Sequence, residues 1–271
     1  MSKIRVIYMG KNKPEVLEGL EFLLQNDFEV TAIVGFSDIK NGSNSSNLVN
    51  FAMEKKLKVI TDEYIYNELN KKLNSRSEFL KDIDLVISYL FWKKIKKPLI
   101  ELPKLGCINF HPAPLPDFRG VAPYSFGILE KTTFWGVSAH FVDESFDTGD
   151  IIRIKKFDID PDVETAFSLE QKSQKVMFEL FKEVMIGLLD KGSFPRKPQM
   201  SKGHYFSKDY FEEIRKISSD DSLEEIKIKI RAFWYPPFDG ATLSIKNKDF
   251  TLIDENILKE IAVNYNQKNN L

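Results

Sequence analysis

The sequence has few cysteines and histidines, and this scarcity excludes several kinds of site. A single cysteine, Cys107, stands among 271 residues, so neither an intramolecular disulfide nor a thiolate metal cluster can form. The three histidines, at positions 111, 140 and 204, lack the spacing of metal ligands. The sequence also contains no Gly-x-Ser-x-Gly elbow, no Walker loop and no Gly-x-Gly-x-x-Gly fingerprint. We therefore expect a metal-free site.

Net charge and long apolar runs are also nearly absent. The 39 basic and 40 acidic residues leave a net charge of −1, which gives no global attraction for a polyanion, so we expect no nucleic-acid partner. No window approaches the roughly 20 apolar residues needed to cross a bilayer. The apolar stretch near the N-terminus is short and contains Arg5, as in a strand and unlike a signal sequence. We expect a cytoplasmic protein with no membrane partner.

What the sequence does contain is a clear alternation of strand and helix patterns in its first half. Hydrophobic residues make up 42% of the chain, enough for a globular protein with a sizeable core. Strands separated by helices of about ten residues imply crossover connections and a mostly parallel sheet in an α/β fold. Strands are expected at 4–9, 29–34, 57–60, 84–91, 106–110, 137–142 and 150–157, and helices at 15–25 and 47–56.

The second half changes character after one long helix. Thr165 can cap this helix, and Gly192 lies just past its end. A segment rich in Pro, Lys and Gly at 194–203, here called the connector, separates an α/β domain at 1–195 from a small α+β subdomain at 204–271. In the subdomain, Ser222 and Glu225 form a capping box, and residues 241–245 and 250–253 predict a β-hairpin. The basic run 93–97 is interpreted as a solvated helix face.

Two polar residues, Asn109 and His111, lie at the end of the strand expected at 106–110. Alternate residues of a strand share a face, so Asn109 and His111 point the same way, roughly 6.6 Å apart along the chain. The prolines that follow leave His111 at the carboxyl end of the strand, the edge where ligands bind in open α/β sheets. An acidic loop at 143–150 contains Asp147. Together these residues can form an acyl-transfer site, in which Asn109 donates to an oxyanion, His111 supplies a proton and Asp147 orients or deprotonates.

Each of these residues also has a purely structural interpretation. Asn109 can tie a loop to the sheet, and Asp147 can be a turn residue before Gly149. An isolated strand histidine is more often structural than catalytic. Cys107 lies too far along the same strand for a thiol–imidazole pair with His111, so we interpret it as a small core residue.

Three motifs resemble those of the 10-formyltetrahydrofolate-dependent formyltransferases. They are Ile-Asn-Phe-His-Pro-Ala-Pro-Leu-Pro at 108–116, Arg-Gly-Val-Ala-Pro at 119–123, and the acidic loop. The resemblance covers about residues 1–200 and implies a Rossmann-like formyltransferase domain that uses 10-formyltetrahydrofolate as formyl donor. By it, Asn109, His111 and Asp147 match the catalytic residues of the family.

The same resemblance implies where the folate binds. In the family the pterin docks beside the fourth strand and near the acidic loop. The corresponding residues here are Leu90, Phe91, Ile95, Asp143 and Phe146. Ordinary core packing is the alternative for Leu90 and Phe91.

The formylated amine is expected to belong to a nucleotide-linked sugar. Segments 203–208 and 233–241 resemble the branch that formylates amino sugars on nucleoside diphosphates, such as dTDP-3- or 4-amino sugars, for surface polysaccharides such as O-antigen. Trp234 or Tyr235 would stack on the pyrimidine, and Tyr205, Lys208 and Lys11 would meet the pyrophosphate. The alternative for Trp234 is packing between domains.

Two other functions stay open, and the subdomain also suggests how the protein assembles. A methionyl-tRNA formyltransferase should have a larger, basic C-terminal β-barrel, whereas only about 65 residues follow the connector. A folate- or nucleotide-binding protein without catalysis is the other alternative, although Asn109, His111 and Asp147 are all present. A small β-rich subdomain with exposed aromatic residues would suit a homodimer.

Overall fold

A computed structural model describes residues 3–35, 47–200 and 203–269, and internal contacts divide the chain into two units. Unit 1 comprises Met1–Asp117, Gly136–Lys156 and Ser173–Gly203, and unit 2 comprises Phe118–Trp135, Phe157–Lys172 and His204–Leu271. The last junction falls at the end of the connector. Unit 2 also takes in two earlier segments that the boundary at 195 places in the first domain. The roles expected for the domains 1–195 and 204–271 stay predictions.

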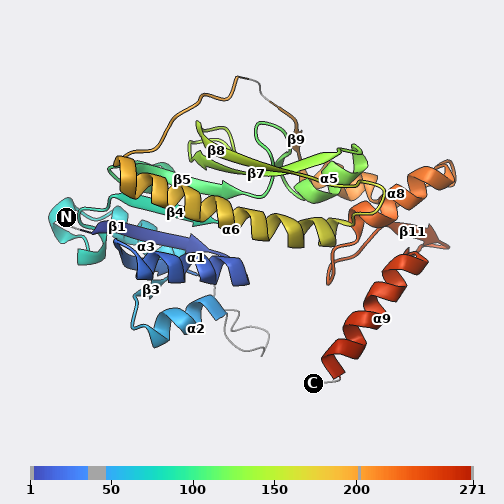
Figure 1. The fold of residues 1–271 in the computed structure, drawn as a ribbon, viewed down its shortest axis with the longest axis horizontal. Coiled ribbons are helices and arrows are strands. Elements are labelled where there is room, and N and C mark those ends of the chain that lie inside the picture. Colours follow the sequence, from blue (N-terminus) through green and yellow to red (C-terminus); the bar gives the residue numbers. More distant parts are fainter. Residues whose placement is uncertain (1–2, 36–46, 201–202, 270–271) are drawn as a thin grey trace. The chain divides into compact units, whose positions relative to one another are not determined.

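A seven-stranded sheet in the order β3-β2-β1-β4-β5-β7-β8 forms the frame of unit 1 (Figure 1). Its strands are β1 (Ile4–Gly10), β2 (Phe28–Val34), β3 (Val59–Ile60), β4 (Leu85–Tyr89), β5 (Gly106–His111), β7 (Phe134–Phe141) and β8 (Ile151–Asp158). The pairs from β3 to β5 are parallel, and β7 runs antiparallel to β5. The predicted α/β fold with a mostly parallel sheet is confirmed.

Helices cover both faces of this sheet, which explains the almost continuous apolar runs of the central strands. Val6 and Tyr8 of β1 pack with α1 and α6 on one face, and Ile7 and Met9 pack with α3 on the other. Thr165 caps α6 by accepting from the Ser168 N–H at 3.0 Å, as predicted. The helices are α1 (Pro14–Gln25), α2 (Asn47–Glu54), α3 (Asp62–Leu69), α4 (Lys97–Ile100) and α6 (Ala166–Lys191), with short 3-10 helices at Leu73–Ser75 and Glu78–Leu80.

Unit 2 is built from short elements around an aromatic core. They are β6 (Arg119–Gly120), α5 (Pro123–Leu129), β9 (Tyr205–Phe206), α7 (Lys208–Ile214), β10 (Lys216–Ile217), α8 (Leu223–Phe233), β11 (Thr242–Ile245), β12 (Lys248–Thr251) and α9 (Glu255–Asn269). The predicted capping box begins α8, because Ser222 and Glu225 exchange side chain–backbone hydrogen bonds of 3.2 and 2.7 Å. The fully buried ring of Trp135 packs against Phe118 and Tyr124.

Two local predictions were wrong, and several helices were not predicted. The run 93–97 is not a helix face, because α4 begins only at Lys97, where a proline follows in the first turn. Strand β12 begins at Lys248, two residues earlier than predicted, because Lys246 and Asn247 have positive φ angles of 49° and 61° and form a two-residue turn. Helices α3, α5, α7 and α9 were not predicted. In the described ranges no helix is long and apolar enough to span a membrane.

Candidate active site

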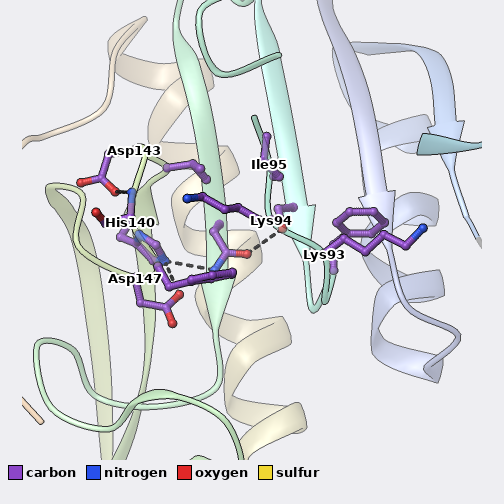
Figure 2. Close-up of a pocket in the computed structure, with 12 residues that line it drawn as sticks. Lys93, Lys94, Ile95, His140, Asp143 and Asp147 are labelled. Carbon is purple, nitrogen blue, oxygen red and sulfur yellow. Dashed lines mark hydrogen bonds and ion pairs between the residues drawn. The ribbon is translucent and has the colours of Figure 1, made fainter. Parts of the chain in front are cut away.

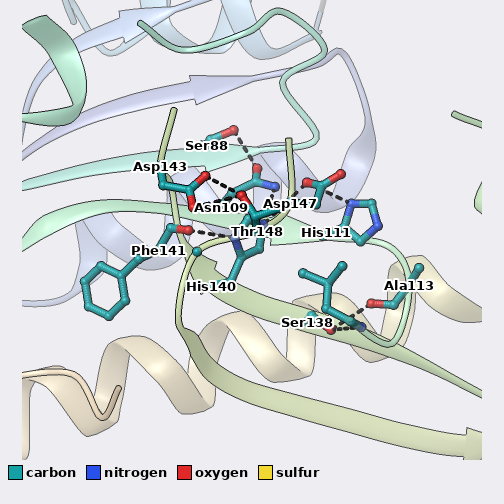
Figure 3. A network of polar contacts seen from close by, with 12 residues as sticks. Ser88, Asn109, His111, Ala113, Ser138, His140, Phe141, Asp143, Asp147 and Thr148 are labelled. Atoms are coloured by element: carbon teal, nitrogen blue, oxygen red, sulfur yellow. Dashed lines mark hydrogen bonds and ion pairs between the residues drawn. The ribbon is translucent and has the colours of Figure 1, made fainter. Parts of the chain in front are cut away.

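The strand order places Asn109 between two polar neighbours. In the parallel pair of β4 and β5, Ser88 lies beside Asn109, and in the antiparallel pair of β5 and β7, His140 lies on its other side. The Ser88 hydroxyl donates to Asn109 Oδ1 at 2.7 Å, and Asn109 Nδ2 lies 3.0 Å from His140 Nε2 (Figure 3). The amide of Asn109 is therefore oriented from both sides by buried partners.

The hydrogen bonds of His140 determine its tautomer. His140 Nδ1 lies 2.7 Å from the carbonyl oxygen of Phe141, which can only accept, so Nδ1 carries the proton. The unprotonated Nε2 then accepts from Asn109 Nδ2. With Oδ1 of Asn109 occupied by Ser88, this network leaves the second N–H of the amide as the donor for a ligand. Asn109 thus has the chemistry of an oxyanion donor.

Asp147 brings its carboxylate to both buried histidines. Its Oδ1 lies 3.5 Å from His111 Nδ1 and 3.6 Å from His140 Nε2 (Figure 3). His111 is only 5% exposed, so the low local dielectric strengthens the attraction of the carboxylate for a His111 imidazolium. Because Nδ1 of His111 faces Asp147, its Nε2 is the ring nitrogen that can face a substrate. The structure therefore brings together Asn109, His111 and Asp147.

The acidic loop has a tight backbone that sets this geometry. Asp147 has a φ of +57°, in the left-handed region that residues other than glycine seldom adopt. A Cβ at Gly149 would lie 2.0 Å from the Phe141 carbonyl oxygen, so only glycine fits there. Asp143 accepts from Thr148 Oγ1 at 2.7 Å and from the Ser145 N–H at 3.0 Å. The loop is thus held by its own side chains.

A pocket opens beside Asn109 and Asp147, between the segment after β4 and the acidic loop (Figure 2). Four of the five residues predicted to bind folate line it: Phe91, Ile95, Asp143 and Phe146. Leu90 is outside the lining that the described residues form. Its φ is +58°, and its side chain packs against the core of the sheet.

Lys94 also lines this pocket, and sequence reasoning did not single it out. Its side chain reaches across the pocket toward the acidic loop, with Nζ 5.7 Å from the centre of the Phe146 ring (Figure 2). The neighbouring Lys93 instead makes an ion pair with Asp62 at 2.8 Å. The pocket therefore combines apolar walls with two carboxylates, Asp143 and Asp147, and two lysines, of which Lys93 is paired with Asp62.

The residues predicted for the nucleotide-sugar lie in both units. Lys11 follows β1 in unit 1, whereas Tyr205, Lys208, Trp234 and Tyr235 belong to unit 2. The Tyr235 hydroxyl donates to Glu170 Oε1 at 2.6 Å, and burial, followed by the nearby Glu170, raises the pKa of this phenol. The hydroxyl of Tyr235 is thus already engaged.

The other residues of this set differ in exposure. Trp234 is half-buried, and its indole Nε1 is buried without a partner among the residues that the structure describes. Tyr205 is 55% exposed on β9, and Lys208 begins α7 on the surface. Binding of a nucleotide by these residues stays a prediction.

Sequence reasoning missed His140 and Ser88, which orient Asn109. Their strands were predicted, but no local pattern gives the order of strands in a sheet. Cys107 is a buried core residue as predicted, and burial raises the pKa of its thiol. Within the described ranges, no group of three His, Cys, Asp or Glu residues is placed to hold a metal ion.

Comparisons with known proteins agree on one family, although the similar proteins have names with different formyl acceptors. A family model described as formyl transferase matches residues 18–185. The chain is 25% identical to the methionyl-tRNA formyltransferase of Clostridioides difficile, over 96% of this chain and 84% of that protein. It is 27% identical to an N-formyltransferase from Helicobacter canadensis solved with folinic acid and dTDP-3-aminofucose, with a TM-score of 0.70 over 90% of this chain and 85% of that one. A 4-N formyltransferase from Francisella tularensis shares the fold at 23% identity, with a TM-score of 0.74 over 93% and 98% of the two chains.

Proposed function

Because the chain belongs to the formyl transferase family, as its motifs predicted, we propose that it formylates the amine of a nucleotide-linked amino sugar. The formyl donor is 10-formyltetrahydrofolate, and the sugar is carried by a nucleoside diphosphate such as dTDP. The observation that supports the reaction is that Asn109 and Asp147 line the pocket, with His111 behind them at 3.5 Å from the Asp147 carboxylate. The sugar class is supported by the Helicobacter canadensis enzyme, whose similarity spans 90% of this chain.

The donor pocket suits a flat heterocycle with an attached anionic chain. Phe91, Ile95 and Phe146 offer apolar walls for a pterin, and Asp143 offers a carboxylate that can accept from ring N–H groups. Lys94 supplies a positive charge for the carboxylates of the glutamate part of folate. When bound, the donor supplies the formyl group as a carbonyl that an amine can attack.

The chain's own residues stabilise the charge that develops during this attack. A new bond forms between the amine nitrogen and the formyl carbon, and negative charge gathers on the formyl oxygen. The free amide N–H of Asn109 and the Nε2–H of a protonated His111 donate to that oxygen. Removal of one such donor typically lowers kcat by about 100- to 1,000-fold.

Asp147 acts on two protons in this reaction, the one held by His111 and the one lost by the amine. Its carboxylate keeps His111 protonated and assists in removing one proton from the attacking amine. The folate nitrogen gains one proton as its bond to the formyl carbon breaks, which releases tetrahydrofolate. The reaction requires no covalent intermediate on the enzyme.

The proposal is tested by supplying purified protein with 10-formyltetrahydrofolate and a dTDP-amino sugar. We expect tetrahydrofolate to be released only when the amino sugar is present, with a product 28 Da heavier, the mass of one added carbonyl group, in mass spectrometry. The variant His111→Asn is the control for the chemical step. Release of tetrahydrofolate without any acceptor, or no release with a panel of dTDP- and UDP-linked amino sugars, would contradict a sugar substrate.

Methionyl-tRNA is the second candidate acceptor, because curated relatives bear that name at 25% to 32% identity. Against it stands the net charge of −1, which leaves little counterion release to support tRNA binding. In the same assay, formylation of methionyl-tRNA with the amino sugars inert would establish this alternative.

A further inference from the structure

Gln199 lies in the connector and contacts the acidic loop, 52 residues away along the chain. Its Nε2 donates to the carbonyl oxygens of Asp147 at 3.0 Å and Gly149 at 2.7 Å. Because carbonyl oxygens only accept, the amide nitrogen must face them. The Oε1 of Gln199 is buried and has no hydrogen-bond partner within the described part of the chain. The two carbonyls therefore determine the orientation of this amide.

Neighbouring connector residues hold the two strands that flank the acidic loop. The backbone of Lys197 exchanges two hydrogen bonds with Ile151, the first residue of β8, at 2.8 and 3.0 Å. The Arg196 guanidinium lies 3.5 Å from the centre of the ring of Phe141, the last residue of β7, and 3.6 Å from the Asp150 carboxylate. The connector thus contacts the chain at both ends of the acidic loop, where β7 ends and where β8 begins.

Gln199 contacts the residue of the acidic loop whose backbone conformation is the least favourable, Asp147. The left-handed backbone of Asp147 persists only if its surroundings fix it. Rotation of the Asp147 carbonyl would also move its carboxylate, which lies 3.5 Å from His111 Nδ1. A hydrogen bond to the Asp147 carbonyl therefore helps to fix the distance between the side chains of Asp147 and His111.

We propose that Gln199 is a positioning residue for formyl transfer, which holds the acidic loop in the conformation that places the Asp147 carboxylate at His111. This inference rests on the proposed function for its effect on catalysis. Gln199 acts only through Asp147 and does not contact substrate. A donor at position 199 is required, because the two groups that it meets are both acceptors.

The first test is a double-mutant cycle with Gln199→Met, which keeps the side-chain length and removes the donor. In the wild-type background we expect kcat to fall about 10- to 100-fold, as for a misplacement of about 1 Å, with KM for the folate donor changed less than about twofold. In the Asp147→Asn background the same change should lower kcat by less than about twofold. Gln25→Met, at the exposed end of α1, is the matched control and should change neither constant. Equal losses in both backgrounds, or a change in KM alone, would overturn the proposal.

The second test needs no activity, because the chain has three histidines that NMR can follow. We expect Gln199→Met to shift the imidazole resonances of His111 and His140, while those of His204, in unit 2, stay in place. Unchanged His111 resonances would disprove positioning by Gln199 even if the wild-type protein transfers formyl groups. If instead the resonances shift and the wild-type protein is inactive, the positioning holds and the proposed function fails.

Discussion

At the scale of single residues, the candidate site is defined by which hydrogen-bonding groups remain free. The amide of Asn109 has its oxygen occupied by Ser88 and one N–H occupied by His140. One N–H remains, next to the imidazole of His111 on the same face of β5. The catalytic role proposed for Asn109 depends on this remaining N–H, since a fully satisfied amide has nothing to offer a developing oxyanion.

His111 and Asp147 are expected to act as a unit. If Asp147 keeps His111 protonated, His111→Asn and Asp147→Asn should each lower kcat at least about 100-fold, as for loss of an oxyanion donor. The double variant should be little worse than either single one, because the second change removes a partner that is already without effect. Single-turnover kinetics with saturating donor and acceptor measures these losses.

Binding provides the control for this prediction. All three variants should bind the folate donor and the sugar nucleotide with unchanged affinity in calorimetry. Losses of kcat that multiply in the double variant would show that the two residues act independently, and the coupled mechanism would be abandoned.

At the scale of elements, the antiparallel return from β7 to β8 creates the acidic loop and fixes its shape. The chain turns so closely that Gly149 contacts the backbone of Phe141. Gly149→Ala should therefore destabilise the protein by about 1–3 kcal/mol, the usual cost of overpacking. Gly187→Ala is the matched comparison, because a Cβ at this position of α6 meets nothing within 4 Å and should stabilise by about 0.5–1 kcal/mol. Urea unfolding measures both values, and equal effects of the two alanines would refute the packing argument.

Glu68 connects α3 to the 3-10 helices that follow it, and this connection should depend on pH. Hydrogen bonds from Lys71 and Ser77 lower the pKa of this carboxylate from about 4.5 to about 2. Because the folded-state pKa lies below the unfolded value, the stabilisation is complete above about pH 4.5 and is lost as the pH falls toward 2. Wild-type protein should therefore melt higher than Glu68→Gln at pH 7, and the difference should shrink between pH 4.5 and 3. A difference in Tm between the two proteins that stays constant with pH would argue against stabilisation by the hydrogen bonds of the Glu68 carboxylate.

At the scale of the whole molecule, unit 2 supplies four of the five residues predicted to bind the nucleotide-sugar, and Lys11 of unit 1 is the fifth. Much of its aromatic surface is used internally: the Tyr235 ring stacks between those of Tyr124 and Phe238. Trp234 makes no such ring contact among the described residues and is half-buried at the end of α8. Of the two aromatic candidates, Trp234 is therefore the better one for stacking on a base.

Trp234→Ala should weaken binding of a dTDP-sugar while leaving folate affinity unchanged. Loss of one stacking partner costs about 1–3 kcal/mol, which corresponds to a roughly 5- to 150-fold higher Kd. Titration calorimetry with dTDP and UDP measures the effect and also compares the two bases. Unchanged nucleotide affinity with a Tm lowered by several degrees would show that Trp234 packs the protein and does not bind substrate.

Much of this protein is encoded locally in its sequence. The period of the apolar residues predicted the sheet strands and the long helix, because burial on both faces of a sheet or on one face of a helix leaves a repeating pattern. Strand alternation placed Asn109 and His111 on one face, and three short motifs indicated the family. Helix α9 left a weaker signal, since Leu258 and Ile261 on it are exposed.

Only the tertiary structure decided which side chains form hydrogen bonds with the residues of the candidate site. Ser88 and His140 reach Asn109 because β5 lies between β4 and β7, and strand order is set by long-range packing that no local period records. Gln199 meets Asp147 across 52 residues of chain for the same reason. The sequence by itself therefore determined most of the sheet strands, the long helix and the candidate side chains of the site, whereas the fold determined their hydrogen-bond partners, because those partners come from segments that are distant in sequence.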